Sequence, residues 1–292
     1  MDRLVFLTVD GLSRGSVYAA FALALVLIWR AARVVNFAQG AMAVAAAYVA
    51  YAVTSASGSY WLGFAAALAA GLLLGAVVDR AVMRFVPTGS PLNAVIVAIG
   101  LVLLIQAGLG MAYGNEFRPA GAPFSRSPLT VGGTPVLSPY DLFVLAAVGL
   151  VVAALGWLFT RTATGLRMRA SAFAPEVSRL LGVDVGGMLT LGWALASGVG
   201  ALAAMLVIPT ELGLHPHAMD LVFVSAFTAA VVGGLDSPAG AVVGGLAVGL
   251  VLSWVGGYLG GDLTGLAVLI LLLAVLLMRP AGLFSAATAR RV

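Results

Sequence analysis

Cysteine and lysine are both absent from the 292-residue sequence, and all 15 of its basic residues are arginine. Without cysteine the chain can form neither a disulfide nor a thiolate metal site, and we expect no metal centre. Without lysine it cannot contain the GxxxxGK phosphate-binding loop of ATPases. If ATP drives this protein, another polypeptide must bind the nucleotide. We therefore expect this chain to bind no cofactor.

Charge is also scarce: charged residues make up 9% of the chain and hydrophobic residues 62%. Soluble domains average about 25% charged and roughly 45–50% apolar residues. The excess is divided into segments near the roughly 20 residues that cross a bilayer. This predicts an all-α polytopic membrane protein, a single transmembrane domain over residues 1–292, with eight to ten helices. The predicted spans are 11–29, 34–54, 61–78, 92–113, 139–159, 188–208, 221–235, 240–259 and 263–278, of which the seventh and ninth are short enough to be half-spans.

Arginines alternate between the loops. One set of loops carries Arg3, Arg118 and Arg126, and Arg14 lies near an end of the first span. The other set carries Arg30, Arg33, Arg80, Arg84, Arg161, Arg167, Arg169, Arg179, Arg279, Arg290 and Arg291. Because cytoplasmic loops are enriched in basic residues, this second set is predicted to be cytoplasmic, together with the C-terminus. Nine spans place the N-terminus outside, whereas eight or ten place it inside. Since the charges lie at segment ends, the net +4 gives no reason to expect nucleic-acid binding.

The acidic residues map mainly to loops and span ends, which disfavours a proton- or sodium-coupled carrier. A secondary transporter stays the nearest alternative, since backbone carbonyls also bind sodium. An intramembrane serine protease is a more distant one, with Ser197 as nucleophile and His215 or His217 as base. Both histidines lie in a predicted external loop, so the sequence favours a transporter without catalytic residues over an enzyme.

The loop 160–187 is the most informative segment on the arginine-rich side. Proline suits the first turn of a helix, an acidic residue suits its positive end, and glycine is a natural stop. Apolar residues at i, i+3 and i+4 give one apolar face. The sequence therefore predicts a helix of about two turns, lying on lipid headgroups or docking into a groove of a cytoplasmic partner. Its residues are Pro175, Glu176, Val177, Arg179, Leu180, Leu181 and Gly182.

Two amides, Asn36 and Gln39, follow Arg30 and Arg33 in an apolar run. Being three apart, they are expected to share one face of the second span. An unpaired amide in hydrocarbon costs several kcal/mol, so that face is expected to avoid lipid. Two interpretations stay open: hydrogen bonds between helices, or a polar lining for a passing zwitterion. Weaker candidates for the same lining are Asn93, Gln106, Ser197 and Ser225.

Glycines four apart let helices approach closely, either within the chain or at a subunit interface. Such pairs are Gly71 and Gly75, Gly240 and Gly244, Gly245 and Gly249, and Gly257 and Gly261. The stretch VVGGLDSPAGAVVGG at 231–245 places Asp236 at the tip of a turn between glycine pairs, and Pro238 is expected to hold Ser237 in an extended or turn conformation. It is predicted to be a tight helical hairpin or a mobile, broken helix near a gate.

Several stretches share their order with a known family: GLSRGSVYAAFALALVLIW, RVVNFAQGAMAVAAAYVAY, PLNAVIVAIGLVLLIQ, TGLRMRASAFAPEVSRLLGVDV, AVVGGLDSPAGAVVGGLAVGL and RPAGLF. Over nearly all of 10–285 the chain resembles the permease subunits of branched-chain amino acid ABC importers, specifically the LivH-like branch. It departs from the usual pattern at Ala174–Pro175–Glu176, Asp236 and Asn93. These departures bear on the cargo, because relatives also carry urea, short amides or other amino acids.

The resemblance implies the ABC importer permease fold in a bacterial inner membrane. It also implies a second homologous permease subunit, two ABC ATPase subunits that use the ATP, and an extracytoplasmic solute-binding protein. It further implies that 160–187 is the coupling loop and that the helix at 174–182 docks the ATPase.

Overall fold

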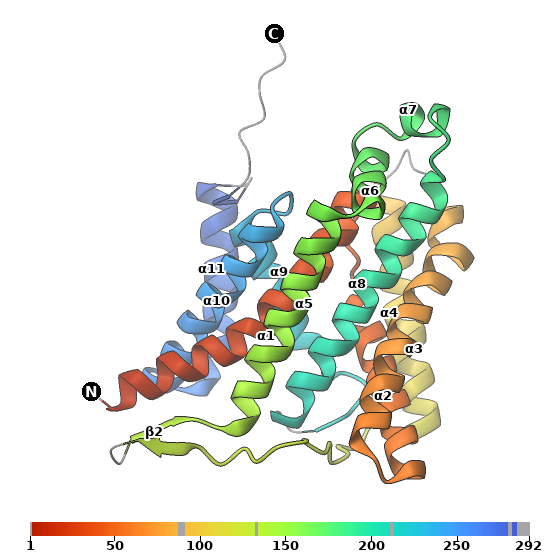
Figure 1. The fold of residues 1–292 in the computed structure, drawn as a ribbon. Coiled ribbons are helices and arrows are strands. Elements are labelled where there is room, and N and C mark those ends of the chain that lie inside the picture. Colours follow the sequence, from red (N-terminus) through yellow and green to blue (C-terminus); the bar gives the residue numbers. More distant parts are fainter. Residues whose placement is uncertain (1, 87–90, 132–133, 211–212, 280–281, 285–292) are drawn as a thin grey trace.

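The computed structural model describes all residues except 1, 87–90, 132–133, 211–212, 280–281 and 285–292 (Figure 1). Its helices are α1 (Asp2–Ala32), α2 (Gln39–Ser57), α3 (Tyr60–Ala81), α4 (Pro91–Tyr113), α5 (Pro139–Arg161), α6 (Ala163–Phe173), α7 (Pro175–Leu180), α8 (Val185–Val207), α9 (Asp220–Gly233), α10 (Pro238–Tyr258) and α11 (Thr264–Met278). Single 3-10 turns occupy Met83–Phe85, Ile208–Thr210 and Gly261–Leu263. In the long loop between α4 and α5, strands β1 (Leu129–Val131) and β2 (Thr134–Leu137) form an antiparallel hairpin.

Helix starts follow local sequence signals. At α5, the Ser138 hydroxyl accepts a hydrogen bond from the Asp141 amide, and the Asp141 carboxylate accepts one from the Ser138 amide. This is a capping box, and Pro139 occupies the first helical position. At α10, Ser237 caps the amide of Gly240 at 3.0 Å from an extended backbone conformation, as predicted.

Eight helices of the described chain are long and apolar enough to cross a membrane. This confirms the predicted all-α polytopic class. The seventh predicted span is a half-span, because α9 has 14 residues and rises about 21 Å. The ninth, by contrast, is long enough to cross when Gly261–Leu263 is counted with α11.

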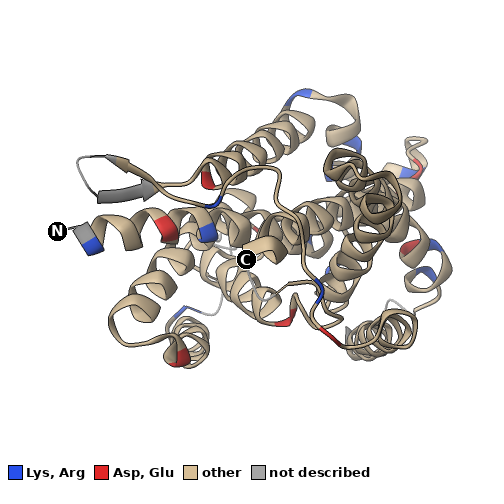
Figure 2. Cartoon of the chain, turned by 90° about the horizontal axis from the view of Figure 1, so that it is seen from below, with Lys and Arg blue, Asp and Glu red and all other residues tan. Residues whose placement is uncertain are grey.

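The prediction that the first span begins at residue 11 was wrong. Helix α1 is continuous over 31 residues from Asp2, a length of about 46 Å. This exceeds the roughly 30 Å of hydrocarbon, and α1 runs obliquely through the bundle (Figure 1). Hydropathy missed the first turns because Arg3 and Asp10 lie there, although neither residue breaks a helix. Figure 2 shows both signs of charge, as blue and red segments, near the start of α1.

Three of the four predicted glycine pairs serve packing within the chain; in the fourth, Gly257 packs against Leu7 but Gly261 has open space around it. A Cβ at Gly11 would lie 2.9 Å from Leu250 Cα, and one at Gly15 would lie 3.0 Å from the Gly245 carbonyl oxygen. Helices α1 and α10 therefore touch backbone to backbone along a glycine seam. Gly71 and Gly75 of α3 meet α8 in the same way, and Gly233 faces Gly240 across the α9–α10 turn. The stretch 231–245 is thus a tight helical hairpin.

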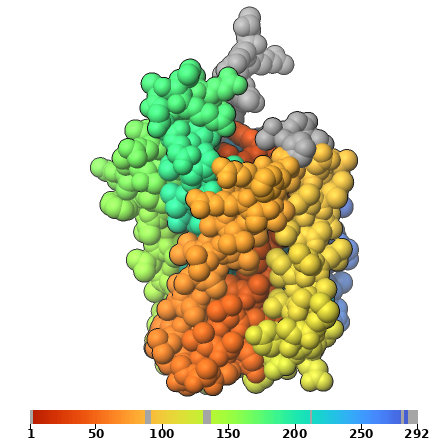
Figure 3. All heavy atoms as spheres, turned by 90° about the vertical axis from the view of Figure 1, so that its right-hand side faces the viewer, coloured from red at the N-terminus to blue at the C-terminus, as the bar shows by residue number. Residues whose placement is uncertain are grey.

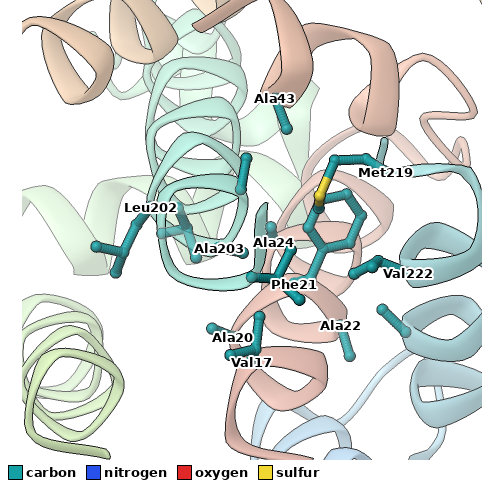
Figure 4. Close-up of a cluster of buried hydrophobic side chains, with 14 of the residues drawn as sticks. Val17, Ala20, Phe21, Ala22, Ala24, Ala43, Leu202, Ala203, Met219 and Val222 are labelled. Atoms are coloured by element: carbon teal, nitrogen blue, oxygen red, sulfur yellow. The ribbon is translucent and has the colours of Figure 1, made fainter. Parts of the chain in front are cut away.

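The core lies where α1 packs against α8 and α9. Phe21 and Val17 of α1 are buried against Leu202 of α8 and Met219 and Val222 near the start of α9 (Figure 4). Helices α3 and α4 instead cover the side seen in Figure 3, where apolar side chains stay exposed. Since bilayer lipid is as apolar as these side chains, this surface is expected to face lipid.

The arginine-rich loops gather at one end of the bundle, the upper end in Figure 1. The last turns of α1, α3, α5 and α7 carry Arg30, Arg80, Arg161 and Arg179. Strand β2 lies at the opposite, lower end, and α1 begins toward that end (Figure 1). Arg290 and Arg291 lie outside the described residues. The predicted alternation of arginine content therefore corresponds to two ends of the fold.

Candidate docking surface and membrane cavity

Helix α7 projects from the arginine-rich end of the bundle (Figure 1). It is six residues long with Pro175 at its first position, and Gly182 ends the turn at a φ of 79°. The Val183 amide donates to the Ser178 carbonyl at 2.9 Å, which closes the C-terminal turn. Ser178 is the residue of α7 that packs into the fold. All seven residues predicted for docking are exposed: Pro175, Glu176, Val177, Arg179, Leu180, Leu181 and Gly182.

Four apolar side chains of this segment are exposed among the described residues. Phe173 is 89% exposed, Leu180 88%, Leu181 78% and Val177 55%. We call these four residues the docking surface.

Phe173 was not predicted from the sequence as part of this surface, because 160–173 was expected to be a loop. The structure instead places the end of α5 and all of α6 there. The Thr162 hydroxyl caps α6 by accepting from the Gly165 amide at 3.1 Å.

The two amides lie at a buried corner between α1, α2 and α8. Asn36 Nδ2 donates to Gln39 Oε1 at 2.9 Å, and Gln39 Nε2 donates to the Ala196 carbonyl of α8 at 2.8 Å. Asn36 Oδ1 accepts from the Ala38 amide at 3.0 Å. The prediction of one shared helix face was wrong, because Asn36 precedes α2 in a non-helical turn. Both side chains are fully buried, so the hydrogen-bonding interpretation describes this conformation.

The four weaker pathway candidates separate in space. Asn93 is exposed at the start of α4, and Ser197 is buried in α8 with an unpartnered Oγ. Gln106 donates to the carboxylate of Asp220 at 3.0 Å. Ser225 donates to the Leu221 carbonyl within α9 at 3.0 Å. Of the six predicted residues, Ser225 alone lines a cavity between α1, α9, α10 and α11.

That cavity has a volume of about 880 Å³ and opens between α1, α9, α10 and α11. Its walls are mostly apolar, with Leu221 and Val222 from α9, Leu252 from α10 and Val268 from α11. Helix α9 is short, and the segment 213–219 before it is non-helical. His215, His217 and Ala218 of this segment line the cavity. We call it the membrane cavity.

A carboxylate and a guanidinium from one face of α1 line the membrane cavity. Asp10 and Arg14 form an i, i+4 ion pair with an oxygen–nitrogen distance of 3.1 Å. Ser253 of α10 places its Oγ 2.9 Å from Asp10 Oδ2 and 2.7 Å from the Leu7 carbonyl oxygen. The charged pair is thus held against α10 at the end of the glycine seam.

Two histidines complete the polar lining. Burial lowers the pKa of His215 below its usual value, His217 acts in the same direction, and Asp220 opposes them. His217 Nδ1 lies 3.0 Å from Asp220 Oδ2, and Asp220 also binds Gln106. Sequence reasoning assigned both histidines to a loop and gave Asp10 and Arg14 no site. Their proximity depends on the tilt of α1 and on the half-length of α9.

At the arginine-rich end, the tip of the α9–α10 hairpin is tied to the end of α1. Asp236 Oδ1 accepts from Arg33 Nη1 at 2.6 Å and from Trp29 Nε1 at 3.3 Å. Arg33 adopts a φ of 56°, a conformation that side-chain-bearing residues seldom take. The departure at Asp236 therefore has a structural role in this chain.

The whole arrangement can be compared with known proteins. Residues 7–277 match the family model described as the branched-chain amino acid transport system, permease component. The chain belongs to this family. It is 27% identical to the high-affinity branched-chain amino acid transport permease BraD of Pseudomonas aeruginosa over 94% of both chains. It is 26% identical to LivH of Escherichia coli, over 94% of this chain and 93% of that one.

A probable LivH of Methanocaldococcus jannaschii is 27% identical over 78% of this chain and 74% of its own. Among solved structures, PsaBC from Streptococcus pneumoniae in complex with Fab covers 96% of the chain with a TM-score of 0.49 and 15% identity. The LivH-like resemblance is thereby confirmed by family and relatives. Family members are transport permeases of the membrane, so the chain is a transporter subunit and not an enzyme.

Proposed function

We propose that this chain forms, with a second homologous permease subunit, the transmembrane pathway of an ATP-driven importer for branched-chain amino acids. Its family and the names of its relatives support this cargo. The observation that carries the ATP-driven mechanism is the docking surface, an apolar cluster presented to solvent at the arginine-rich end. A chain without lysine needs a partner that binds the nucleotide, and this cluster offers that partner a contact.

The partners we propose are two ABC ATPase subunits, which use the ATP, and an extracytoplasmic solute-binding protein. The arginine-rich end then faces the cytoplasm with the docking surface and the C-terminus, in agreement with the positive-inside bias. The start of α1 and the β1–β2 hairpin face the outside, where cargo is delivered. The host membrane is the bacterial inner membrane.

The test is reconstitution of the full assembly in proteoliposomes with purified binding protein. We expect leucine to accumulate when ATP reaches the ATPase side, and not when the ATPase subunits carry an inactivating substitution. Competition by urea, short amides and other amino acids defines the cargo. Leucine accumulation by the permease pair alone, driven by an ion gradient without nucleotide, contradicts the proposal and indicates a secondary transporter.

A further inference from the structure

The membrane cavity has mostly apolar walls, but its lining includes charged side chains that lipid cannot solvate. Asp10, Arg14, His215 and His217 are among the residues that line it. Charged groups in membrane proteins face water or other protein groups, because hydrocarbon cannot solvate them. This cavity therefore opens onto water or onto a second permease subunit, unlike the apolar outer faces of α3 and α4.

The lining matches one chemical class of ligand. A carboxylate and a guanidinium four residues apart on α1 present both signs of charge at one side of the space. The same cavity is also lined by the aliphatic side chains of Leu221, Val222 and Val268. The volume of about 880 Å³ is within the range of small-molecule sites, about 300–1,000 Å³. A small zwitterion with an apolar side chain complements both the charged pair and the aliphatic walls.

We propose that the membrane cavity is a cargo site in the outer half of the pathway, in which Asp10 contacts the ammonium group and Arg14 the carboxylate of an α-amino acid. The aliphatic walls contact its side chain. Ser253 is a positioning residue, since it fixes Asp10 against α10. This inference rests on the proposed function as an amino acid importer, and it assigns recognition to α1 and α9 instead of to the buried amide corner.

The first experiment tests whether the cavity is open to water. Because the chain has no cysteine, one introduced cysteine is its only thiol. Leu221 lines the cavity and is 77% exposed, whereas Leu104 of α4 lies on the outer face at 68%. In the reconstituted assembly, Leu221→Cys and Leu104→Cys are treated with a charged, membrane-impermeant methanethiosulfonate. We expect Leu221→Cys to react at least roughly tenfold faster, since the thiolate forms in water and not in lipid. Equal rates overturn the inference.

The second experiment tests recognition of the charges. Asp10→Asn and Arg14→Gln are compared with wild type for ATP-driven leucine uptake, copurification of the ATPase subunits and melting temperature. Because hydrogen bonds to charged groups are the stronger ones, we expect each variant to lower uptake by roughly tenfold or more, with assembly and melting temperature unchanged. Arg14→Lys, which keeps the charge, is expected to recover part of the uptake.

Uptake within twofold of wild type in both variants, at about the precision of such assays, overturns the inference. So does a loss of uptake that follows a fallen melting temperature, because the ion pair is then a structural contact only. The proposed function fails separately, when wild type itself shows no ATP-driven leucine uptake. The thiol-labelling rates can be compared whether or not wild type transports leucine.

Discussion

Replacing both docking leucines by aspartate tests the link between this chain and its proposed ATPase. Leu180 and Leu181 are 88% and 78% exposed, so nearly all of their apolar surface is available to a partner. The double variant Leu180→Asp/Leu181→Asp removes that surface and adds two charges. It leaves the buried contact of Ser178 in place, so α7 is expected to keep its position on the fold.

The magnitude follows from the area lost. Burying one leucine side chain stabilises a complex by about 1.5–3 kcal/mol, and ordering each side chain costs about 0.5–1.5 kcal/mol. When the low figures are paired and the high figures are paired, two leucines contribute about 2–3 kcal/mol net. At about 1.4 kcal/mol per tenfold, the ATPase binds the variant roughly 30- to 140-fold more weakly. Placing carboxylates in an apolar groove adds a desolvation cost, so this range is a lower bound.

The assay is copurification of the ATPase with detergent-solubilised permease, followed by titration to obtain a Kd. Membrane insertion is checked by the amount of each variant in the membrane fraction. The matched control is Leu166→Asp, which changes a leucine that is 59% exposed on α6 and lies outside the docking surface. We expect the control to bind the ATPase as wild type does. An unchanged Kd for the double variant, or equal losses in variant and control, refutes the assignment of the docking surface.

Three further predictions concern stability. Gly249→Leu forces a side chain into the backbone of α1, where overpacking costs about 1–3 kcal/mol or more, and we expect no monodisperse protein on size-exclusion chromatography. Gly108→Leu, with open space around it, is expected to elute normally. Gln39→Leu removes the hydrogen bond to Ala196 and the oxygen acceptor of Asn36 Nδ2, so it should cost about 1–3 kcal/mol and lower the melting temperature. Because burial lowers the pKa of His215, the folded state binds fewer protons than the unfolded state, and the free energy of unfolding falls as the pH falls below about 6.5. Melting curves above and below that pH should show this loss, and His215→Gln should reduce it.

The spans and helix α7 were predictable because their signals are local. Hydropathy over twenty residues marks a span wherever its neighbours lie in space. At 175–182, proline and glycine mark the two ends of α7, and the spacing of Val177, Leu180 and Leu181 gives its apolar face. In the described part of the chain this face stays exposed. Its exposure could therefore be predicted without knowing how the other helices pack.

The amide corner was only partly predictable. The cost of an unpaired amide required Asn36 and Gln39 to have partners, and the structure provides them. Spacing alone suggested a common helix face, but α1 ends at Ala32 and α2 begins at Gln39. The turn between them allows Asn36 to fold back onto Gln39. A hydropathy profile does not reveal an interruption of the helix inside an apolar run, such as the one between α1 and α2.

The membrane cavity was not predictable from the sequence, because it depends on the oblique path of α1 and on the short length of α9. An upright α1 would place Asp10 and Arg14 in the external headgroup region, where they would need no site. The oblique path of α1 instead brings them beside α10, and backbone contact between Gly15 and Gly245 fixes that path. A full-length α9 would fill the space opposite. The position of the charged pair is therefore set by glycines, which carry no chemistry of their own, and substitution at the glycine seam should displace the pair without changing either charge.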